Sequence, residues 1–396
     1  MSETVAVDSS AIRRIGIIGG GQLAWMMAPA AQTLGLDLVI QTPSPTDPTV
    51  SLATQSILAA VDDVSATAML ASCCDVITFE NEFVDLGGLA QLAAAGACFR
   101  PSLTTLAPLL DKYQQRSCLR DLGLPVPAFV ALEAFHPTAE QPWMHSFPRV
   151  LKTRRHGYDG QGTFIVKDQR QWDLLLARLA DRPLLVEEFV PFERELAVIA
   201  ARSVEGTVVT YPVVETYQVN QVCRWVVAPA TVSPTVTMQA EAIAQRLLTH
   251  LDAVGVFGIE LFLTADHQLL VNEVAPRVHN SGHFTLDACQ TSQFEQHLRA
   301  VAGLPLGSPA MSASAALMVN LLGYEQSHHD YQEKRNQLAD LPNVYVHWYG
   351  KTESRPGRKL GHVTVLLEGE AAQPPAAIAL AQEIERIWYD SAGETP

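Results

Sequence analysis

The densest group of chemically active side chains lies in residues 272–283, which read NEVAPRVHNSGH. Glu273, Arg277 and His279 stand within this short run, together with two asparagines and a second histidine. Oxygen ligands suit Mg²⁺, and Mg²⁺ in enzymes commonly links protein carboxylates to substrate phosphates. So many acidic, basic and imidazole groups in one run predict a site that handles a phosphate-rich ligand through a divalent metal.

Two β-type segments, residues 256–263 and 268–274, are predicted to form a hairpin about a short turn. Its symmetric register places Glu260 directly opposite Glu273. Directly opposed side chains have Cβ atoms about 5 Å apart, and two carboxylates so close repel each other unless cations bind between them. We therefore predict that Glu260 and Glu273 bind Mg²⁺ and that a bulge would add Asn272. An exposed repulsive pair is the alternative.

Residues 157–162, GYDGQG, form a glycine-rich loop that follows a lysine-bearing β-type segment. Three glycines in six residues allow a loop to fold over phosphates. Lys152 lies in the otherwise apolar residues 150–152, where a charge is costly unless it meets a fixed anion. The phosphates of ATP would supply that anion, and a plain hairpin turn is the alternative.

Residues 184–190 are apolar except for two carboxylates, Glu187 and Glu188, and Glu195 follows shortly after them. A strand that links two lobes can present its backbone to an adenine edge and a carboxylate to ribose hydroxyls. An ordinary edge strand with acidic residues is the alternative. Short β-type runs and glycine-rich loops over residues 148–200 favour a small α+β lobe here.

A β–α–β pattern over residues 12–18, 22–34 and 36–40 predicts an open parallel sheet. The turn GGGQLA, residues 19–24, matches a loose dinucleotide fingerprint. The second strand, however, ends without the acidic residue that a nicotinamide dinucleotide needs for its ribose. The turn is therefore interpreted either as a tight connection or as a phosphate site for another ligand.

Glu80 directly follows a further β-type segment, residues 75–79. The carboxyl edge of an open parallel sheet is where ligands bind. We therefore predict that Glu80 faces a ligand, with a solvated loop as the alternative. Farther along, a single helix is expected over residues 105–122, and late strands are expected within residues 312–321 and 343–366.

The basic residues Lys351, Arg355, Arg358 and Lys359 lie within nine positions of a strongly acidic chain. Arginine side chains match the geometry of phosphate oxygens, and the intervening glycine lets a ligand approach the backbone closely. This cluster predicts a phosphate-bearing substrate, and a solvated basic loop is the alternative.

The composition of the chain limits its class. Its 396 residues, 48% hydrophobic and 17% charged, suffice for two or three domains. A net charge of −15 argues against a general nucleic-acid binder. No apolar run reaches the ~20 residues of a membrane helix, the first residues do not read as a signal peptide, and the six cysteines form no C-x-x-C pair. We expect a cytoplasmic protein with no membrane or nucleic-acid partner.

Taken together, these residues resemble the ATP-grasp superfamily and, within it, the N5-carboxyaminoimidazole ribonucleotide synthetases of purine biosynthesis. The likeness extends from about residue 13 to residue 366. It rests on several motifs in the same order as in that family: GGGQL (19–23), GYDGQG (157–162), NEVAPRVHNSGH (272–283), SQFEQHLRA (292–300), GLPLG (303–307) and RPGRKLGH (355–362).

The resemblance implies a fold of mixed α/β and α+β class. It implies an N-terminal open parallel-sheet domain over residues 1–111 and a two-lobed ATP-grasp domain over residues 112–310. The small lobe of the latter would occupy about residues 123–190 and the large lobe about residues 191–310. A small C-terminal domain would follow over residues 311–396, and the protein would be a homodimer.

The resemblance also implies a reaction. ATP would phosphorylate bicarbonate to carboxyphosphate, and the exocyclic amine of 5-aminoimidazole ribonucleotide would capture either that intermediate or the CO₂ released from it. A closed site that excludes water fits such chemistry.

The family's functional residues transfer to matching positions of this sequence. For ATP and its Mg²⁺ ions they are Lys112, Lys152, Gly157, Gly160, Gly162, Glu187, Glu188, Phe189, Val190, Glu195, Glu260, Asn272 and Glu273. For the ribonucleotide they are Glu80, Tyr158, Asp159, His279, Lys351 and Arg358, with the glycine loop at residues 19–21 nearby. The chain departs from the family pattern at Ala24, Trp25, His156, Gln161 and Thr163.

Three other functions remain as alternatives. A different ATP-grasp ligase, such as a formate-dependent glycinamide ribonucleotide transformylase, would share the ATP and metal residues. An NAD-dependent oxidoreductase would use the turn at residues 19–24. A catalytically inactive binding protein would be consistent with Trp25, His156 and Gln161, although both metal carboxylates and Lys152 are retained.

Overall fold

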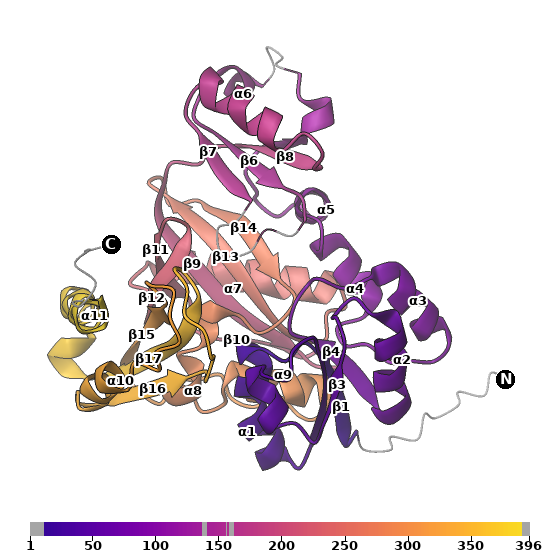
Figure 1. Ribbon diagram of the computed structural model, residues 1–396. Helices are drawn as coiled ribbons and strands as arrows, with labels where there is room; N and C mark the ends of the chain where they lie inside the picture. Colours follow the sequence, from indigo (N-terminus) through magenta and orange to yellow (C-terminus); the bar gives the residue numbers. More distant parts are fainter. Residues whose placement is uncertain (1–11, 137–140, 156, 158–161, 390–396) are drawn as a thin grey trace.

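The computed structural model describes residues 12–136, 141–155, 157 and 162–389, which form three β-sheets flanked by helices (Figure 1). The N-terminal sheet is parallel, with strand order β3-β2-β1-β4. Its strands are nearly continuous apolar runs because helices cover both faces. The elements of this domain are β1 (Arg14–Ile18), α1 (Gln22–Leu34), β2 (Asp37–Thr42), η1 (Pro48–Ser51), β3 (Gln55–Leu58), α2 (Val64–Cys73), β4 (Val76–Phe79) and α3 (Leu86–Ala94). The predicted open parallel sheet is confirmed.

The connection to the next domain differs from the single helix expected over residues 105–122. It consists of α4 (Leu103–Leu106), the 3₁₀ turn η2 (Ala107–Leu109) and α5 (Lys112–Asp121). Pro108 lies at the start of the turn, and Asp111 caps α5 by accepting the backbone N–H groups of Tyr113 and Gln114. A proline and a capping aspartate so close together stop one helix and start another, which sets the direction of α5.

The small lobe is a four-stranded antiparallel sheet of order β5-β8-β6-β7 at the top of Figure 1. Helix α6 packs on one face, and Leu151, Val166, Trp172 and Val186 form its core. Its elements are β5 (Phe129–Ala131), η3 (Leu132–Ala134), η4 (Pro142–His145), β6 (Arg149–Thr153), β7 (Thr163–Val166), α6 (Gln169–Arg178) and β8 (Leu184–Glu188).

The large sheet has nine antiparallel strands in the order β14-β13-β9-β11-β12-β15-β17-β16, with β10 paired to β9. Helix α7 packs on β9, and α9 contacts both β13 and β9. Its first elements are β9 (Phe192–Arg202), β10 (Val208–Thr210), β11 (Val214–Val219), β12 (Val222–Ala228), α7 (Pro234–His250), β13 (Gly255–Thr264), β14 (Leu269–Ala275), η5 (Asn280–Gly282), α8 (Thr285–Ala288) and α9 (Gln293–Ala302).

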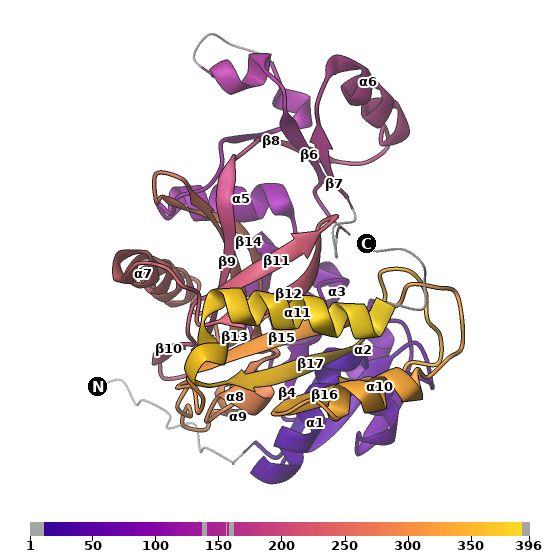
Figure 2. The same cartoon turned by 90° about the vertical axis from the view of Figure 1, so that its left-hand side faces the viewer.

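The C-terminal segment completes this sheet and has no sheet of its own. Strand β15 pairs with β12, so the C-terminal strands continue the sheet of the central domain. Helix α11 lies across these strands on the outside (Figure 2). The elements are β15 (Ala315–Leu322), α10 (Gln332–Ala339), β16 (Val344–Trp348), β17 (Lys359–Leu367), η6 (Gly369–Ala372) and α11 (Pro374–Tyr389).

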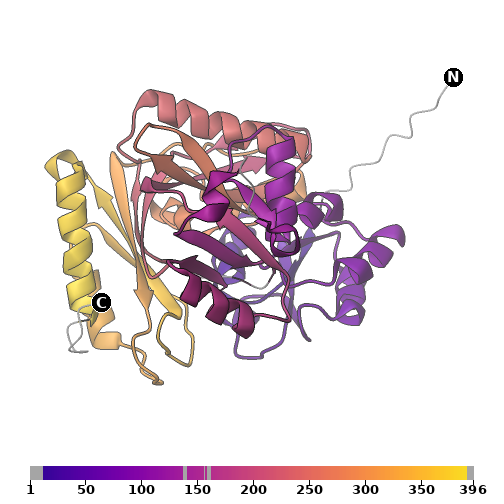
Figure 3. The ribbon, with the colours of Figure 1, turned by 90° about the horizontal axis from the view of Figure 1, so that it is seen from above.

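Seen from above, the C-terminal segment and the N-terminal domain lie on opposite sides of the molecule, and the small lobe covers the middle (Figure 3). All six cysteines are free thiols. Among the described residues, no helix combines the length and apolar character that crossing a membrane requires. The parts therefore surround one central region. Ligand sites commonly lie in such a place between lobes.

Candidate active site

A cavity of about 680 Å³ lies where the small lobe, the large sheet and the N-terminal domain meet. A volume of this size accommodates a nucleotide. Most of the predicted ligand-binding residues lie in its wall: Glu80, Lys112, Lys152, Gly157, Glu187, Glu188, Phe189, Val190, Glu195, Glu260, Asn272, Glu273 and His279. They come from separate elements, which the fold brings together at this one place.

The β13–β14 hairpin has the predicted register, because Glu260 pairs directly with Glu273. The predicted bulge is also present, since the register shifts between Glu260 and Leu261. The shift turns Asn272 toward the same side, where its side-chain N–H donates to Glu260 Oε2 at 3.3 Å. The two carboxylates and the side-chain amide of Asn272 therefore lie together at the cavity wall.

The pKa values of the two carboxyls are shifted in opposite directions. Burial and the neighbouring Glu273 raise the pKa of Glu260 to about 7. Burial also raises the pKa of Glu273, but the ammonium of Lys112, with Nζ 2.5 Å from Oε2, outweighs it and lowers that pKa overall. Burial and Glu260 together raise the pKa of Glu195 to about 7. The group thus holds excess negative charge that a cation would neutralise.

The donor set at this position suits Mg²⁺. Mg²⁺ prefers oxygen ligands, and in nucleotide enzymes it takes one or two protein carboxylates and completes its shell with phosphates and water. Glu260 and Glu273 supply that pair, and Asn272 Oδ1 lies 3.3 Å from Lys152 Nζ. Within the described part of the chain, no group of three or more histidine, cysteine or acidic side chains is placed to hold a metal ion.

Glu187, which was expected to line the adenine, is held by two cations in the protein interior. Its carboxylate lies 2.6 Å from Arg116 Nε and 2.7 Å from Lys152 Nζ. Burial alone would raise its pKa, but the guanidinium and then the ammonium lower it to about 2. The fixed anion that Lys152 requires is therefore Glu187, so the charge of Lys152 alone no longer argues for ATP.

Glu80 fills the start of helix α1. Its carboxylate accepts the backbone N–H groups of Gly21, Leu23 and Ala24 at 2.7, 3.0 and 3.4 Å. A Cβ on Gly21 would lie 2.6 Å from this carboxylate, so the glycine permits the approach. Because a protein carboxylate takes the anion-binding position, the helix start does not receive a phosphate. Burial nevertheless raises the pKa of Glu80, and the side chain still borders the cavity.

His279 lies beside the carboxylate pair at the end of β14. Its Nε2 is 3.5 Å from Glu260 Oε1, and its Nδ1 is 2.9 Å from Ser281 Oγ. A Cβ on Gly258 would lie 2.5 Å from His279 Cβ, so the imidazole packs directly on the backbone of β13. The imidazole therefore has a fixed place beside Glu260, against β13.

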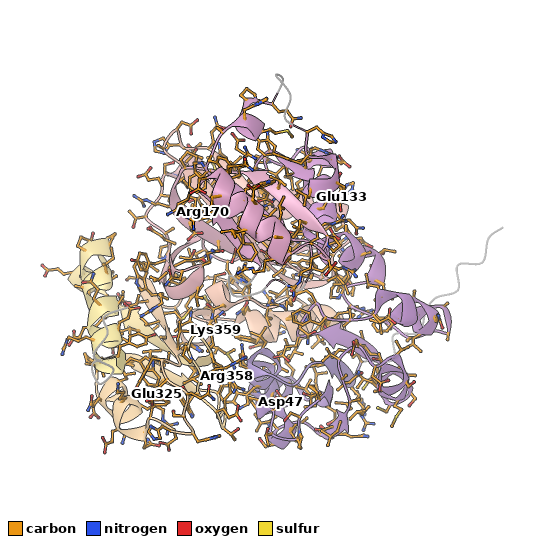
Figure 4. All side chains as sticks on the ribbon, turned by 45° about the horizontal axis from the view of Figure 1, so that its top comes forward. Asp47, Glu133, Arg170, Glu325, Arg358 and Lys359 are labelled. Carbon is orange, nitrogen blue, oxygen red and sulfur yellow. The ribbon has the colours of Figure 1, made fainter. Side chains whose placement is uncertain are left out.

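The basic cluster is only partly in the cavity wall. Lys359 lines the cavity, whereas Lys351 and Arg358 do not. Lys351 Nζ donates to the carbonyl of Lys359 at 2.7 Å, and Arg358 Nη1 donates to the carbonyl of Glu353 at 3.0 Å. Figure 4 shows Arg358 and Lys359 between the C-terminal strands and the N-terminal domain. Lys351 and Arg358 thus lie beside Lys359, one through a hydrogen bond and the other as its chain neighbour, but outside the cavity wall.

The glycine-rich loop and the positions that depart from the family pattern are only partly described by the structure. Tyr158, Asp159 and Gly160, with His156 and Gln161, lie outside the described residues. Gly162 has φ +84°, and a Cβ there would lie 2.2 Å from Thr153 Oγ1. Thr163 lines the cavity, and Trp25 packs edge-on against Tyr349 at 6.0 Å.

The site also contains residues that the sequence reasoning missed. Arg116 links α5 to Glu187 and donates to the carbonyl of Val271 at 3.0 Å. Phe192 and Phe262 stack in the wall with ring centroids 4.5 Å apart. Arg277, which the sequence had already indicated, pairs through its Nε with Glu82 Oε1 at 2.9 Å. An arginine four residues after Lys112, on the same helix face, was the available signal for Arg116.

Family models match three consecutive parts of the chain. They describe a ribonucleotide synthetase preATP-grasp domain over residues 12–107, an ATP-grasp domain over residues 117–294 and a phosphoribosylaminoimidazole carboxylase C-terminal domain over residues 316–373.

Two curated relatives are similar to the chain over nearly its whole length. The N5-carboxyaminoimidazole ribonucleotide synthase of Synechococcus elongatus is 54% identical over 385 residues, 97% of each chain. The enzyme of the same name from Bacillus subtilis is 37% identical and covers 96% of each chain.

Solved structures agree in fold. The N5-carboxyaminoimidazole ribonucleotide synthetase of Thermotoga maritima has a TM-score of 0.82 and 37% identity, covering 95% of this chain and 98% of that one. The Aspergillus clavatus N5-carboxyaminoimidazole synthase, in complex with ADP and 5-aminoimidazole ribonucleotide, has a TM-score of 0.84 and 32% identity, covering 94% and 100%. The chain is therefore a member of the N5-carboxyaminoimidazole ribonucleotide synthase family of ATP-dependent ligases.

Proposed function

We propose that the chain carboxylates 5-aminoimidazole ribonucleotide with bicarbonate at the cost of ATP, giving N5-carboxyaminoimidazole ribonucleotide, ADP and phosphate in purine biosynthesis. The observation that carries the proposal is the pairing of Glu260 with Glu273 next to Lys112 and Lys152 in one cavity. The names of the relatives and the ligands of the Aspergillus clavatus structure support the same reaction.

ATP would lie between the small lobe and the large sheet. Lys112 and Lys152 would contact its phosphates, under the loop from Gly157 to Gly162. The backbone of Glu188, Phe189 and Val190 would line the adenine, and Glu195 would hold the ribose. Glu187 would act indirectly, because its ion pair with Lys152 holds that lysine at the cavity wall. An apolar floor from the stacked Phe192 and Phe262 supports a nucleobase or sugar at this end.

Glu260 and Glu273, with Asn272 beside them, would hold Mg²⁺. When bound, Mg²⁺ neutralises the charge of the transferring phosphate. Lys112 would keep Glu273 ionised, because its ammonium lowers the pKa of that carboxyl. Glu260 would lose its proton on metal binding, since the raised pKa comes from burial and the neighbouring carboxylate.

The ribonucleotide would lie toward the N-terminal domain. Glu80, Tyr158, Asp159, His279, Lys351 and Arg358 are the residues that we assign to it. Glu80 supports this assignment because its carboxylate is anchored by three backbone N–H groups while its side chain borders the cavity. Such an anchored acceptor suits a sugar hydroxyl better than a phosphate. The basic residues Lys351 and Arg358, together with Lys359, suit the phosphate end.

The chemistry would proceed in two steps. A bicarbonate oxygen attacks the γ-phosphorus of ATP, and ADP leaves, which gives carboxyphosphate. The exocyclic amine then attacks the carboxyl carbon of carboxyphosphate, or of CO₂ formed from it, while phosphate leaves and the amine gives up a proton. The departing phosphate can take that proton, and His279 would contact the ribonucleotide from the cavity wall beside the carboxylate pair. Closure around the cavity would exclude water, which would otherwise hydrolyse the carboxyphosphate.

The domain boundaries, the oligomeric state and the location are proposed together with this activity. We propose a cytoplasmic homodimer with domains over residues 1–111, 112–310 and 311–396. The division between the N-terminal sheet and the large sheet supports the first boundary. The comparisons give no support to a glycinamide ribonucleotide transformylase. An NAD-dependent oxidoreductase is disfavoured because Glu80 takes the helix start that would bind pyrophosphate.

The test is ADP formation by the purified protein with Mg-ATP, with bicarbonate and ribonucleotide each added or withheld. The proposal predicts strong turnover only when both are present. With ¹⁸O-labelled bicarbonate, one labelled oxygen should appear in the released phosphate, because carboxyphosphate leaves its bridging oxygen there. Turnover that ignores the ribonucleotide but responds to another acceptor would assign the chain to a different ATP-grasp reaction.

A further inference from the structure

Gln293 grips the backbone of His279 with both ends of its side-chain amide. Its Nε2 donates to the His279 carbonyl at 2.7 Å, and its Oε1 accepts the His279 backbone N–H at 2.9 Å. Gln293 is fully buried and is the first residue of helix α9. This buried amide thus satisfies the backbone N–H and carbonyl of a residue that lies beyond the end of β14.

The surrounding residues fix this amide in turn. Ser292 caps α9, and the backbone N–H of Gln293 donates to Thr285 Oγ1 at 2.9 Å. A Cβ on Gly282 would lie 2.6 Å from Gln293 Oε1, so only glycine lets the amide come this close. Figure 1 shows α9 beneath the large sheet and against α1, where Phe294 and Leu298 are part of the buried core. The amide that holds His279 is therefore attached to a helix that packs in the core.

The clamped backbone carries the imidazole that faces the carboxylate pair. His279 rests on Gly258 of β13, with its Nε2 3.5 Å from Glu260. Rotation of the chain at His279 would swing the ring away from both contacts, because the residue lies beyond the end of β14 and directly precedes the turn η5. Two backbone bonds from one rigid amide prevent that rotation.

We propose that Gln293 is a positioning residue that acts through His279 and sets the place of its imidazole against the ribonucleotide. The inference rests on the proposed function, in which His279 contacts the ribonucleotide. Gln293 itself does not line the cavity, so it would have no direct contact with ligand. Its effect should therefore concern the ribonucleotide and leave ATP binding unchanged.

The chain provides a matched control on the same helix. Gln296 grips Gly307 in the same way, donating from Nε2 to its carbonyl at 2.8 Å and accepting its N–H on Oε1 at 2.7 Å. Gln296 is also fully buried. Neither Gln296 nor Gly307 lines the cavity. The two glutamines thus hold backbone in the same way, and they differ in which backbone they hold and in the further contact of Gln293 Nε2 with His283 Nδ1 at 3.3 Å.

The experiment compares Gln293→Leu, Gln296→Leu, His279→Ala and the double variant Gln293→Leu/His279→Ala in the full chain. Melting temperature, Mg-ATP binding by calorimetry, and kcat and KM for the ribonucleotide are measured. We expect both leucine variants to melt earlier by similar amounts. Gln293→Leu should lose about 100-fold in kcat/KM for the ribonucleotide, the scale of a misplaced group, while Gln296→Leu stays within about twofold of the wild type. Mg-ATP binding should not change in either.

The double variant separates positioning from general damage. If Gln293 acts through His279, adding Gln293→Leu to His279→Ala should cost no further activity. Additive losses, an equal loss in Gln296→Leu, or full activity in Gln293→Leu would overturn the inference, as would full activity in His279→Ala. If Gln293→Leu does not fold, Gln293→Glu keeps the acceptor for the N–H and loses the donor, and the same comparison applies. A wild type that turns over without ribonucleotide contradicts the proposed function and the inference together.

Discussion

Replacement of Glu187 by glutamine should destabilise the chain at neutral pH, because it leaves two buried cations without their anion. Arg116 and Lys152 both contact the Glu187 carboxylate, at 2.6 and 2.7 Å, and all three side chains are buried. The pKa of Glu187 lies at about 2 rather than 4.5. At 1.36 kcal/mol per pH unit, this shift corresponds to about 3 kcal/mol of stability. Loss of one partner from a buried ion pair has a similar magnitude.

The sign of the pH dependence follows from the lowered pKa. A carboxyl whose pKa is lower in the native state contributes stability above its unfolded pKa and loses it as the pH falls toward the native pKa. The difference between wild type and Glu187→Gln should therefore be about 3 kcal/mol at pH 7 and shrink to about 1 kcal/mol at pH 3. The glutamine variant lacks the titrating group, so its own curve should be flatter over this range.

Urea titrations followed by circular dichroism at pH 7, 5 and 3 would measure these free energies of unfolding. Glu188→Gln is the matched control, because it makes the same substitution one residue farther on, at an exposed position. That variant should stay within about 0.5 kcal/mol of the wild type. An equally small change in Glu187→Gln, or a loss that does not shrink toward pH 3, would refute the reasoning about the buried triad.

Three further predictions concern the cavity. Gly258→Ala should lower kcat/KM for the ribonucleotide about 100-fold, because the new Cβ would lie 2.5 Å from His279 Cβ; unchanged steady-state kinetics would contradict this packing. Glu273→Gln should slow Mg-ATP-dependent ADP formation by about 100-fold or more, and a rate near that of the wild type would remove Glu273 from the metal site. The rise in melting temperature that Mg²⁺ causes should be larger at pH 7.5 than at pH 5.5, because burial and neighbouring carboxylates raise the pKa of Glu260 and Glu195 to about 7, and a bound cation competes with the protons that these carboxyls hold at the lower pH. An equal rise at the two pH values would contradict metal binding there.

Local patterns predicted the parts of the site that lie close together in the sequence. The register of the β13–β14 hairpin follows from a short turn and alternating side chains, so Glu260 could be placed opposite Glu273 before the fold was known. The break before α5 was also signalled locally, by Pro108 and Asp111, although one helix was expected. In both cases the groups belong to one short stretch of chain, residues 260–273 for the hairpin and 108–111 for the break.

Contacts between distant segments were beyond such patterns. The partner of Glu187 on α5, Arg116, is 71 residues away, and Glu80 meets the start of α1 across 57 to 59 residues. The first contact changes the interpretation of Glu187 from a ligand contact to an internal anchor, and the second gives Glu80 a structural role in addition to its place in the cavity wall. The C-terminal strands likewise join the large sheet through β12 and β15, a pairing that depends on strand order in space. Sequence periodicity determines which face of a strand is buried but not which strand lies next to it.

The central claim is that one cavity joins bicarbonate to the amine of the ribonucleotide at the expense of ATP. The most direct measurement is carbon-13 NMR of the product formed from ¹³C-bicarbonate, Mg-ATP and 5-aminoimidazole ribonucleotide, with ADP measured in the same sample. The account predicts a new carbamate carbon signal on the ribonucleotide, in a one-to-one ratio with ADP at early times, and neither product with Glu273→Gln. ADP formation without any labelled carbamate would contradict the account.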